Sequence, residues 1–198
     1  MIRIKRIFDL TTAIILLIVF FIPIIFLMIL VKISSKGPIF YKWNVIGKEG
    51  KPFTSYKFRT MINNAENMKK QIIQENEMTG PVFKMKEDPR ITTLGKYFRK
   101  YSLDELPQLW SVLKGDMSLV GPRPPLQTEW IDFEEWQKRK VSVKPGITCT
   151  WQVNGRNEVS DFNDWVKMDL DYIDNWTFLM DIKILVKTIP AVLSGSGH

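Results

Sequence analysis

Residues 10–31, LTTAIILLIVFFIPIIFLMILV, form a run of 22 consecutive residues without a charged side chain. As an α-helix this segment would be about 33 Å long, and the hydrocarbon core of a bilayer is about 30 Å thick. A signal peptide has a shorter apolar core and a small-residue cleavage site, which residues 29–34 do not offer. The segment therefore predicts a membrane anchor that stays on the protein.

Pro23 lies near the middle of this segment. Its ring removes a backbone donor and clashes with the carbonyl group of Val19, which predicts a kink in the helix. Basic residues occur on both sides of the segment, at Arg3, Lys5, Arg6, Lys32 and Lys36. Because lysine and arginine favour the cytoplasmic side, this symmetry gives no crossing direction. We expect a re-entrant helix with both ends in the cytosol, and a spanning helix is the alternative.

The rest of the chain has the length and composition of one domain with its own core. We expect an anchor over residues 1–35 and a domain over residues 36–198 that packs on the membrane surface. Ten of the 28 basic residues but two of the 21 acidic residues lie in residues 1–60, so the net charge of +7 comes from the membrane-proximal part. This charge favours anionic lipids or a negatively charged substrate. No nucleic-acid motif accompanies it, so nucleic acid is not an expected partner.

The apolar pattern beyond the anchor predicts a mainly α fold with a small β-hairpin. Residues 39–61 are rich in β-branched and aromatic side chains around a turn at residues 47–52, which predicts two short strands. Helical spacing of apolar residues predicts a helix over residues 90–101, whereas residues 65–78 are polar and predict an exposed helix or a mobile loop. Further helices are expected over residues 130–136, from Ser160 onward, and over residues 179–193, the last amphipathic and ended by Gly195.

Two adjacent carboxylates, Asp104 and Glu105, lie in the segment YSLDELPQ at residues 101–108. Ser102 and Glu105 have the spacing of a capping box, in which each side chain binds the backbone N–H group of the other residue. Taken alone, the segment favours a capped helix start over catalysis. The two roles are compatible, because free N–H groups at a helix start also bind phosphate oxygens.

Cations occur on nearby loops and strands. Arg123 lies between two prolines, whose fixed φ angles reduce the entropy that its guanidinium loses on binding a phosphate. Arg156 lies in a second loop, and Lys57 and Arg59 lie on a predicted strand. Each cation alone fits an ordinary solvated side chain. Together with the carboxylate pair they suit phosphoryl transfer with a divalent metal.

Six motifs follow one another along the chain: YKFRTM at residues 56–61, DPRIT at 88–92, RKYSLDELPQ at 99–108, LVGPRP at 119–124, KPGIT at 144–148 and QVNGRN at 152–157. Their order resembles the bacterial sugar transferases called monotopic phosphoglycosyl transferases, in the form of the minimal members that consist of the catalytic domain. The resemblance covers nearly the whole chain. It implies a monotopic membrane protein with a kinked re-entrant helix and amphipathic helices at the membrane interface.

The resemblance also implies roles for individual residues. Asp104 would attack the β-phosphate of a UDP-sugar, expel UMP and carry a covalent phosphosugar, in a ping-pong mechanism. Glu105 would be the second catalytic residue, assisting proton handling, and with Asp104 it would hold Mg²⁺. The cations expected to contact substrate are Arg99, Arg123 and Arg156, with Lys57 and Arg59 as weaker candidates for phosphate or lipid headgroup contact.

The implied acceptor is undecaprenyl phosphate, and the implied place is the cytosolic face of the bacterial inner membrane, at the first membrane step of lipid-linked glycan synthesis. Membrane lipids and downstream glycosyltransferases would be further partners. One alternative is a non-catalytic scaffold for glycan-assembly enzymes, and another is a conventional glycosyltransferase that releases UDP. The sequence does not distinguish galactose, glucose or N-acetylated sugars, nor whether His198 is native.

Overall fold

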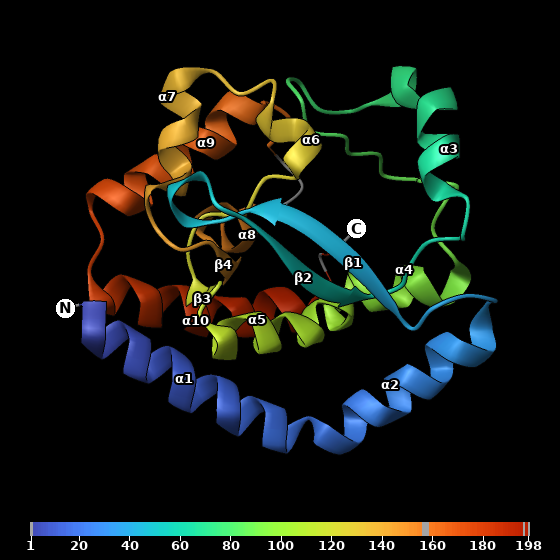
Figure 1. Ribbon diagram of the computed structural model, residues 1–198, viewed down its shortest axis with the longest axis horizontal. Helices are drawn as coiled ribbons and strands as arrows, with labels where there is room; N and C mark the ends of the chain where they lie inside the picture. Colours follow the sequence, from blue (N-terminus) through green and yellow to red (C-terminus); the bar gives the residue numbers. More distant parts are fainter. Residues whose placement is uncertain (1, 156–158, 196, 198) are drawn as a thin grey trace.

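The computed structural model describes residues 2–155, 159–195 and 197, and in them the chain is mainly helical with two small sheets (Figure 1). The α-helices are α1 (Ile2–Val19), α2 (Phe21–Ser34), α3 (Ala65–Gln71), α4 (Thr93–Lys100), α5 (Leu109–Lys114), α6 (Gln127–Trp130), α7 (Glu135–Lys138), α8 (Thr150–Val153), α9 (Phe162–Asp174) and α10 (Phe178–Leu193). The strands are β1 (Phe40–Ile46), β2 (Pro52–Phe58), β3 (Ser118–Val120) and β4 (Gly146–Thr148). Short 3₁₀ helices are η1 (Lys48–Gly50), η2 (Ile73–Glu75), η3 (Leu103–Gln108) and η4 (Arg139–Ser142).

The predicted anchor is two helices that meet at Phe20 with a bend of 64° (Figure 1). Pro23 lies in the first turn of α2, where its missing N–H group leaves no intrahelical bond unmade. The predicted kink is therefore confirmed. In the described part of the chain no single helix is long and apolar enough to cross a bilayer, whereas α1 and α2 together have the required length and composition.

The first turns of α1 bind the domain through charged side chains. The buried carboxylate of Asp9 accepts hydrogen bonds from Ser118 Oγ at 2.8 Å and from the backbone N–H of Leu119 at 3.1 Å. Lys5 Nζ lies 2.6 Å from Asp181 Oδ2 at the start of α10. These contacts direct Lys5 toward protein groups, so this part of the basic N-terminus is paired within the fold.

The far end of α2 is also attached to the domain, through Arg59 just after β2. Its guanidinium donates to the carbonyl oxygens of Ser35, at 2.7 Å, and of Lys36. The last carbonyls of a helix have no intrahelical donor, and a cation there also complements the helix dipole. The bent pair is thus fixed at both of its ends to the same body of protein.

The predicted hairpin is confirmed. Strands β1 and β2 pair antiparallel with Trp43 opposite Ser55, and the chain turns between them at Glu49 and Gly50, both with positive φ. A second sheet, in which β3 and β4 pair in parallel, was not predicted. Each of its strands has three residues, too few for a period of two to be recognised in sequence.

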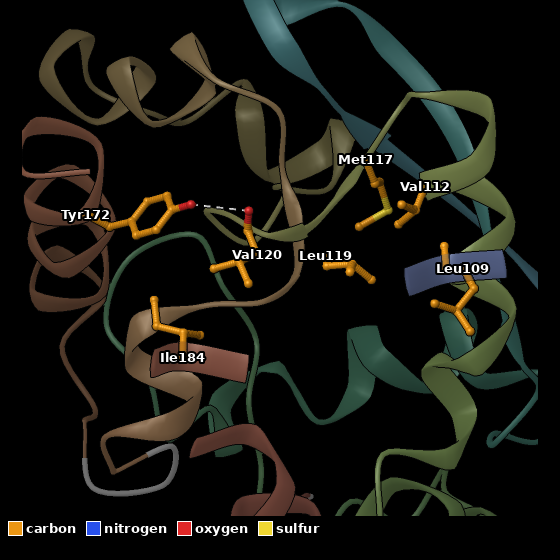
Figure 2. Close-up of a cluster of buried hydrophobic side chains, with 8 residues drawn as sticks. Leu109, Val112, Met117, Leu119, Val120, Tyr172 and Ile184 are labelled. Atoms are coloured by element: carbon orange, nitrogen blue, oxygen red, sulfur yellow. Dashed lines mark hydrogen bonds between the residues drawn. The ribbon is translucent and has the colours of Figure 1, made fainter. Parts of the chain in front are cut away.

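Figure 2 shows a buried cluster to which α5, β3, α9 and α10 contribute. The labelled side chains are Leu109, Val112, Met117, Leu119, Val120, Tyr172 and Ile184. The Tyr172 hydroxyl lies 2.6 Å from Asp181 Oδ1 and 3.3 Å from the Val120 carbonyl oxygen, and both oxygens are acceptors for its hydrogen. Helix α1 adds Ala13, which is fully buried in the same cluster. Part of the predicted anchor therefore belongs to the hydrophobic core of the domain.

Three of the helices predicted beyond the anchor are confirmed, and one prediction is wrong. Helices α4, α9 and α10 form where apolar spacing predicted them, α9 starting after Asp161 rather than at Ser160. Gly195, with a φ of 67°, ends the last turn after α10 as expected. The single helix predicted over residues 130–136 is wrong: α6 ends at Trp130 and α7 begins at Glu135, so Phe133 lies between two short helices.

Candidate active site

A cavity of about 760 Å³ opens between the β1–β2 hairpin, η3, the end of α4 and the proline-rich loop after β3. The predicted site residues that line it are Lys57, Arg59, Arg99, Asp104, Glu105 and Arg123. The sequence-derived set therefore converges on one cavity. Arg156 lies outside the described residues.

The two carboxylates lie at the start of η3 and are both buried, with exposures of 7% for Asp104 and 8% for Glu105. The predicted capping box is wrong. Ser102 adopts a left-handed conformation with a φ of 51°, and its side chain makes no capping hydrogen bond. The chain forms a 3₁₀ turn there and continues into α5, with Gln108 as the residue before it. Asp104 and Glu105 therefore line the cavity, and Glu105 does not form a capping box with Ser102.

Two cations face Glu105. Lys57 Nζ donates to Glu105 Oε1 at 2.7 Å, and Arg123 Nη1 lies 4.0 Å from the same oxygen. Burial lowers the pKa of the Lys57 ammonium, and the attraction of Glu105 opposes this shift. Arg123 is the more accessible of the two cations, with a side-chain exposure of 35% against 13% for Lys57. An incoming anion can therefore reach Arg123 without displacing protein groups.

Arg99 supplies a third cation from the last turn of α4. Its Nε donates to Thr60 Oγ1 at 2.9 Å, which fixes the guanidinium at the cavity wall. Burial lowers the pKa of Arg99, while the negative charge of Asp104 acts in the opposite direction. A guanidinium stays charged in spite of such a shift. Arg59 also reaches the cavity, but its guanidinium is engaged by the carbonyls at the end of α2.

Sequence reasoning gave no role to several residues of this cavity. Asp88 and Arg90 form a buried pair, with Arg90 Nε and Nη2 donating to the carboxylate at 2.9 and 2.7 Å. Trp151 and Trp165 stack with ring centroids 4.1 Å apart and line the same cavity. The sequence DPR at residues 88–90 could have indicated the Asp88–Arg90 pair, because a carboxylate two residues before an arginine can accept hydrogen bonds from both Nε and Nη2 of that arginine. No local pattern indicates the second pair, which α8 and α9 bring together.

The carboxylate pair fits Mg²⁺. This ion is commonly held by one or two carboxylates, with substrate phosphates and waters completing the coordination. Asp104 and Glu105 supply two carboxylates in a cavity that is also lined by the cations of Lys57, Arg99 and Arg123. Among the described residues no cluster of three or more potential ligating side chains occurs, so a metal here would depend on substrate oxygens.

Comparison with known proteins gives consistent matches over the whole length. Residues 1–195 match the family described as Bacterial sugar transferase. The chain is 48% identical over 193 residues to the galactosyl transferase CpsE of Streptococcus agalactiae, covering 98% of this chain and 43% of that protein. It is 43% identical over 197 residues to the undecaprenyl-phosphate galactose phosphotransferase of Salmonella typhimurium, covering 98% of this chain and 41% of that protein.

A third relative is closer in size. The chain is 44% identical over 196 residues to the uncharacterized sugar transferase EpsL of Bacillus subtilis, and the match covers 98% of this chain and 89% of that protein. The chain therefore spans less than half of the first two relatives and most of the third.

Proposed function

The chain belongs to the bacterial sugar transferase family, and from this premise we propose that it transfers a sugar 1-phosphate from a UDP-sugar to undecaprenyl phosphate and releases UMP. The observation that carries the proposal is the cavity in which Asp104 and Glu105 lie beside Lys57, Arg99 and Arg123. Relatives named for galactose phosphate and N-acetylgalactosamine phosphate transfer to undecaprenyl phosphate support the same reaction class.

The proposed reaction has two displacements at one phosphorus atom. An oxygen of Asp104 attacks the β-phosphorus of the UDP-sugar, and the bond to the bridging oxygen breaks, so that UMP leaves with the electron pair. The sugar phosphate is then held as an acyl phosphate on Asp104. A phosphate oxygen of undecaprenyl phosphate attacks the same phosphorus, releases the Asp104 carboxylate and gives undecaprenyl diphosphate sugar.

The cations of the cavity neutralise the phosphates during these steps. Arg123 is accessible between two prolines and is placed to bind the diphosphate on entry, while Arg99 is fixed by Thr60 at the cavity wall. Lys57 holds Glu105 in place. Asp104 and Glu105 would hold Mg²⁺, which when bound supplies positive charge to the leaving phosphate. We assign Arg59 to the junction of α2 with the hairpin, because its donors are used there.

We further propose that α1 and α2 form a re-entrant anchor on the cytosolic face of the bacterial inner membrane. Asp9 and Lys5 bind α1 to the domain, and Arg59 binds the end of α2 to the same domain, so both ends lie on one side. A helix that crosses the bilayer would leave its ends on opposite sides. Exposed apolar side chains support contact with lipid, among them Ile14, Ile18, Phe21, Ile22, Phe26 and Ile29 on the bent pair and Leu179, Val186, Ile189 and Leu193 on α10.

The test is nucleotide release by the purified protein in detergent, with Mg²⁺, undecaprenyl phosphate and a panel of UDP-sugars. UMP release with at least one sugar, lost in Asp104→Asn and kept in the exposed control Asp132→Asn, is the expected result. Release of UDP would indicate glycosyl transfer instead. Full activity of Asp104→Asn would overturn the covalent mechanism. Absence of any release across the panel would contradict the proposed reaction for the sugars tested and favour a scaffold.

A further inference from the structure

One aromatic ring at the cavity wall contacts two of the phosphate-binding cations. Trp43, in the middle of β1, is 5% exposed and lines the cavity. Lys57 Nζ lies 4.2 Å from the centroid of its ring, and Arg123 Cζ lies 5.4 Å from it. Both distances are within the range of about 6 Å over which a cation is attracted to the face of an indole.

The same two cations also converge on Glu105, so two positive charges lie close to one carboxylate oxygen. Glu105 Oε1 is 2.7 Å from Lys57 Nζ and 4.0 Å from Arg123 Nη1. Two cations that share one carboxylate repel each other, and the nearby charge of Arg123 acts to lower the pKa of Lys57. The attraction of the indole for each cation offsets part of this repulsion.

An indole suits this task better than a carboxylate in addition to Asp104 and Glu105 would. A carboxylate would hold the cations more strongly, but its negative charge would repel a diphosphate and would occupy the donors that the diphosphate needs. The ring of Trp43 attracts cations through its quadrupole and carries no net charge. It can therefore align Lys57 and Arg123 while leaving their charge available to an anion.

The fold supplies all three side chains from well-defined backbone. Trp43 pairs with Ser55 across the hairpin, and Lys57 is two residues farther along β2, so Trp43 and Lys57 are diagonal neighbours on one face of the sheet. Arg123 stands between Pro122 and Pro124 in the loop after β3. The cation platform of Trp43, Lys57 and Arg123 is thus built from two paired strands and a loop bounded by prolines.

We propose that Trp43 is a positioning residue, whose indole ring holds the cations of Lys57 and Arg123 in register for the diphosphate of the nucleotide sugar. The identity of that anion rests on the proposed function. The alignment of the two cations by Trp43 does not depend on the proposed function, so the affinity for a simple diphosphate anion is the property to measure. Because the ring acts through two cations, its removal should weaken diphosphate binding more than the loss of the same packed volume elsewhere in the cavity wall would.

The experiment is isothermal titration of inorganic pyrophosphate and of UMP into the purified protein and its variants. We expect Trp43→Leu to raise the Kd for pyrophosphate about tenfold and Trp43→Phe, which keeps a π face, to raise it about two- to threefold. Trp43→Met, which has about the volume of leucine but a more flexible side chain, is a second variant without a ring and should match leucine. The control Trp136→Leu changes a partly exposed tryptophan of α7 and should leave both affinities unchanged. Thermal unfolding selects the variants that are folded.

A double-mutant cycle distinguishes positioning from packing. If Trp43 acts through the cations, Trp43→Leu causes a clearly smaller loss of pyrophosphate affinity in an Arg123→Gln background than in the wild type. An equal loss in both backgrounds, or the same Kd for leucine, methionine and wild type, would overturn the inference. Pyrophosphate binding that follows the predicted order without release of UMP from any UDP-sugar would support Trp43 as a positioning residue and contradict the proposed reaction.

Discussion

Lys57 Nζ and Glu105 Oε1 are 2.7 Å apart in the wall of the cavity, with side-chain exposures of 13% and 10%. Each of these buried charges depends on the other, because an unpaired ion in such surroundings is poorly solvated. The pair also ties β2 to η3, the element that carries Asp104. The ion pair between Lys57 and Glu105 therefore also helps to fix the position of Asp104, the proposed nucleophile.

Replacement of Glu105 by glutamine tests this pair. We expect Glu105→Gln to lower the free energy of unfolding by about 3 kcal/mol, since Lys57 remains buried without its carboxylate. UMP release should also fall at least tenfold. Thermal and denaturant unfolding in detergent measure the first effect. The exposed control Glu135→Gln should change stability by less than about 0.5 kcal/mol, and an equally small effect of Glu105→Gln would contradict the prediction.

The buried pair of Asp88 and Arg90 predicts an acid-sensitive contribution to stability. Burial acts to raise the pKa of Asp88, but the hydrogen bonds from Arg90 outweigh it and hold this pKa below its ordinary value of 3.8. The carboxylate therefore stabilises the fold fully above that value, and the contribution disappears as the pH falls through the lower, folded pKa. Asp88→Asn should destabilise the protein by about 3 kcal/mol at pH 7 and flatten the pH dependence of unfolding below pH 4. If the pH dependence of unfolding below pH 4 is the same in Asp88→Asn as in the wild type, then other carboxylates determine it and the prediction is contradicted.

The attachment of α1 can be tested at Asp9. Asp9→Ala removes the acceptor of two buried donors, Ser118 Oγ and the N–H of Leu119, and should cost about 2 to 3 kcal/mol of stability. Hydrogen exchange should rise in α1 and in the β3–β4 sheet together. Arg3→Gln alters an exposed side chain of the same helix and serves as the control. If exchange rises in α1 alone, then the helix is attached mainly through its apolar face.

The proposed re-entrant anchor predicts that the residues before the apolar part of α1 and those after α2 lie on the same side of the membrane. Arg3→Cys and Lys36→Cys should both react with a membrane-impermeant maleimide in inverted membrane vesicles and stay protected in intact spheroplasts. The native Cys149 is 2% exposed, and burial raises the pKa of its thiol, so it should contribute no labelling in the folded protein. Opposite labelling of the two positions would indicate a helix that spans the bilayer.

The parts of the fold that follow local rules were predictable from sequence. The hairpin has a glycine-containing turn between two β-rich segments, α4 and α10 have apolar residues at helical spacing, and Pro23 indicated the bend between α1 and α2. The parallel β3–β4 sheet was not predictable, because its partners lie more than 20 residues apart in sequence and each is three residues long. Its pairing depends on tertiary contacts around Leu119, not on a local pattern.

The residues of the candidate site also divide into those that the sequence predicted and those that it did not. The convergence of Asp104, Glu105 and Arg123 was anticipated, because their motifs carry residue types suited to phosphate chemistry. The position of Arg59 was not, since the carbonyls at the end of α2 that bind it have no side-chain signature in the sequence. Trp43 resembles an ordinary strand residue until the structure places two cations at its ring.

The bend at Phe20 has a consequence for how lipids pack around the proposed anchor. If the pair is re-entrant as proposed, it would displace lipid mainly from one leaflet, as a wedge does. On the proposed cytosolic face it would expand that leaflet relative to the opposite one, and a membrane that bulges toward the cytosol would accommodate it more easily. The 64° angle between the two helices would then make the protein sensitive to the shape of the bilayer as well as to its chemistry.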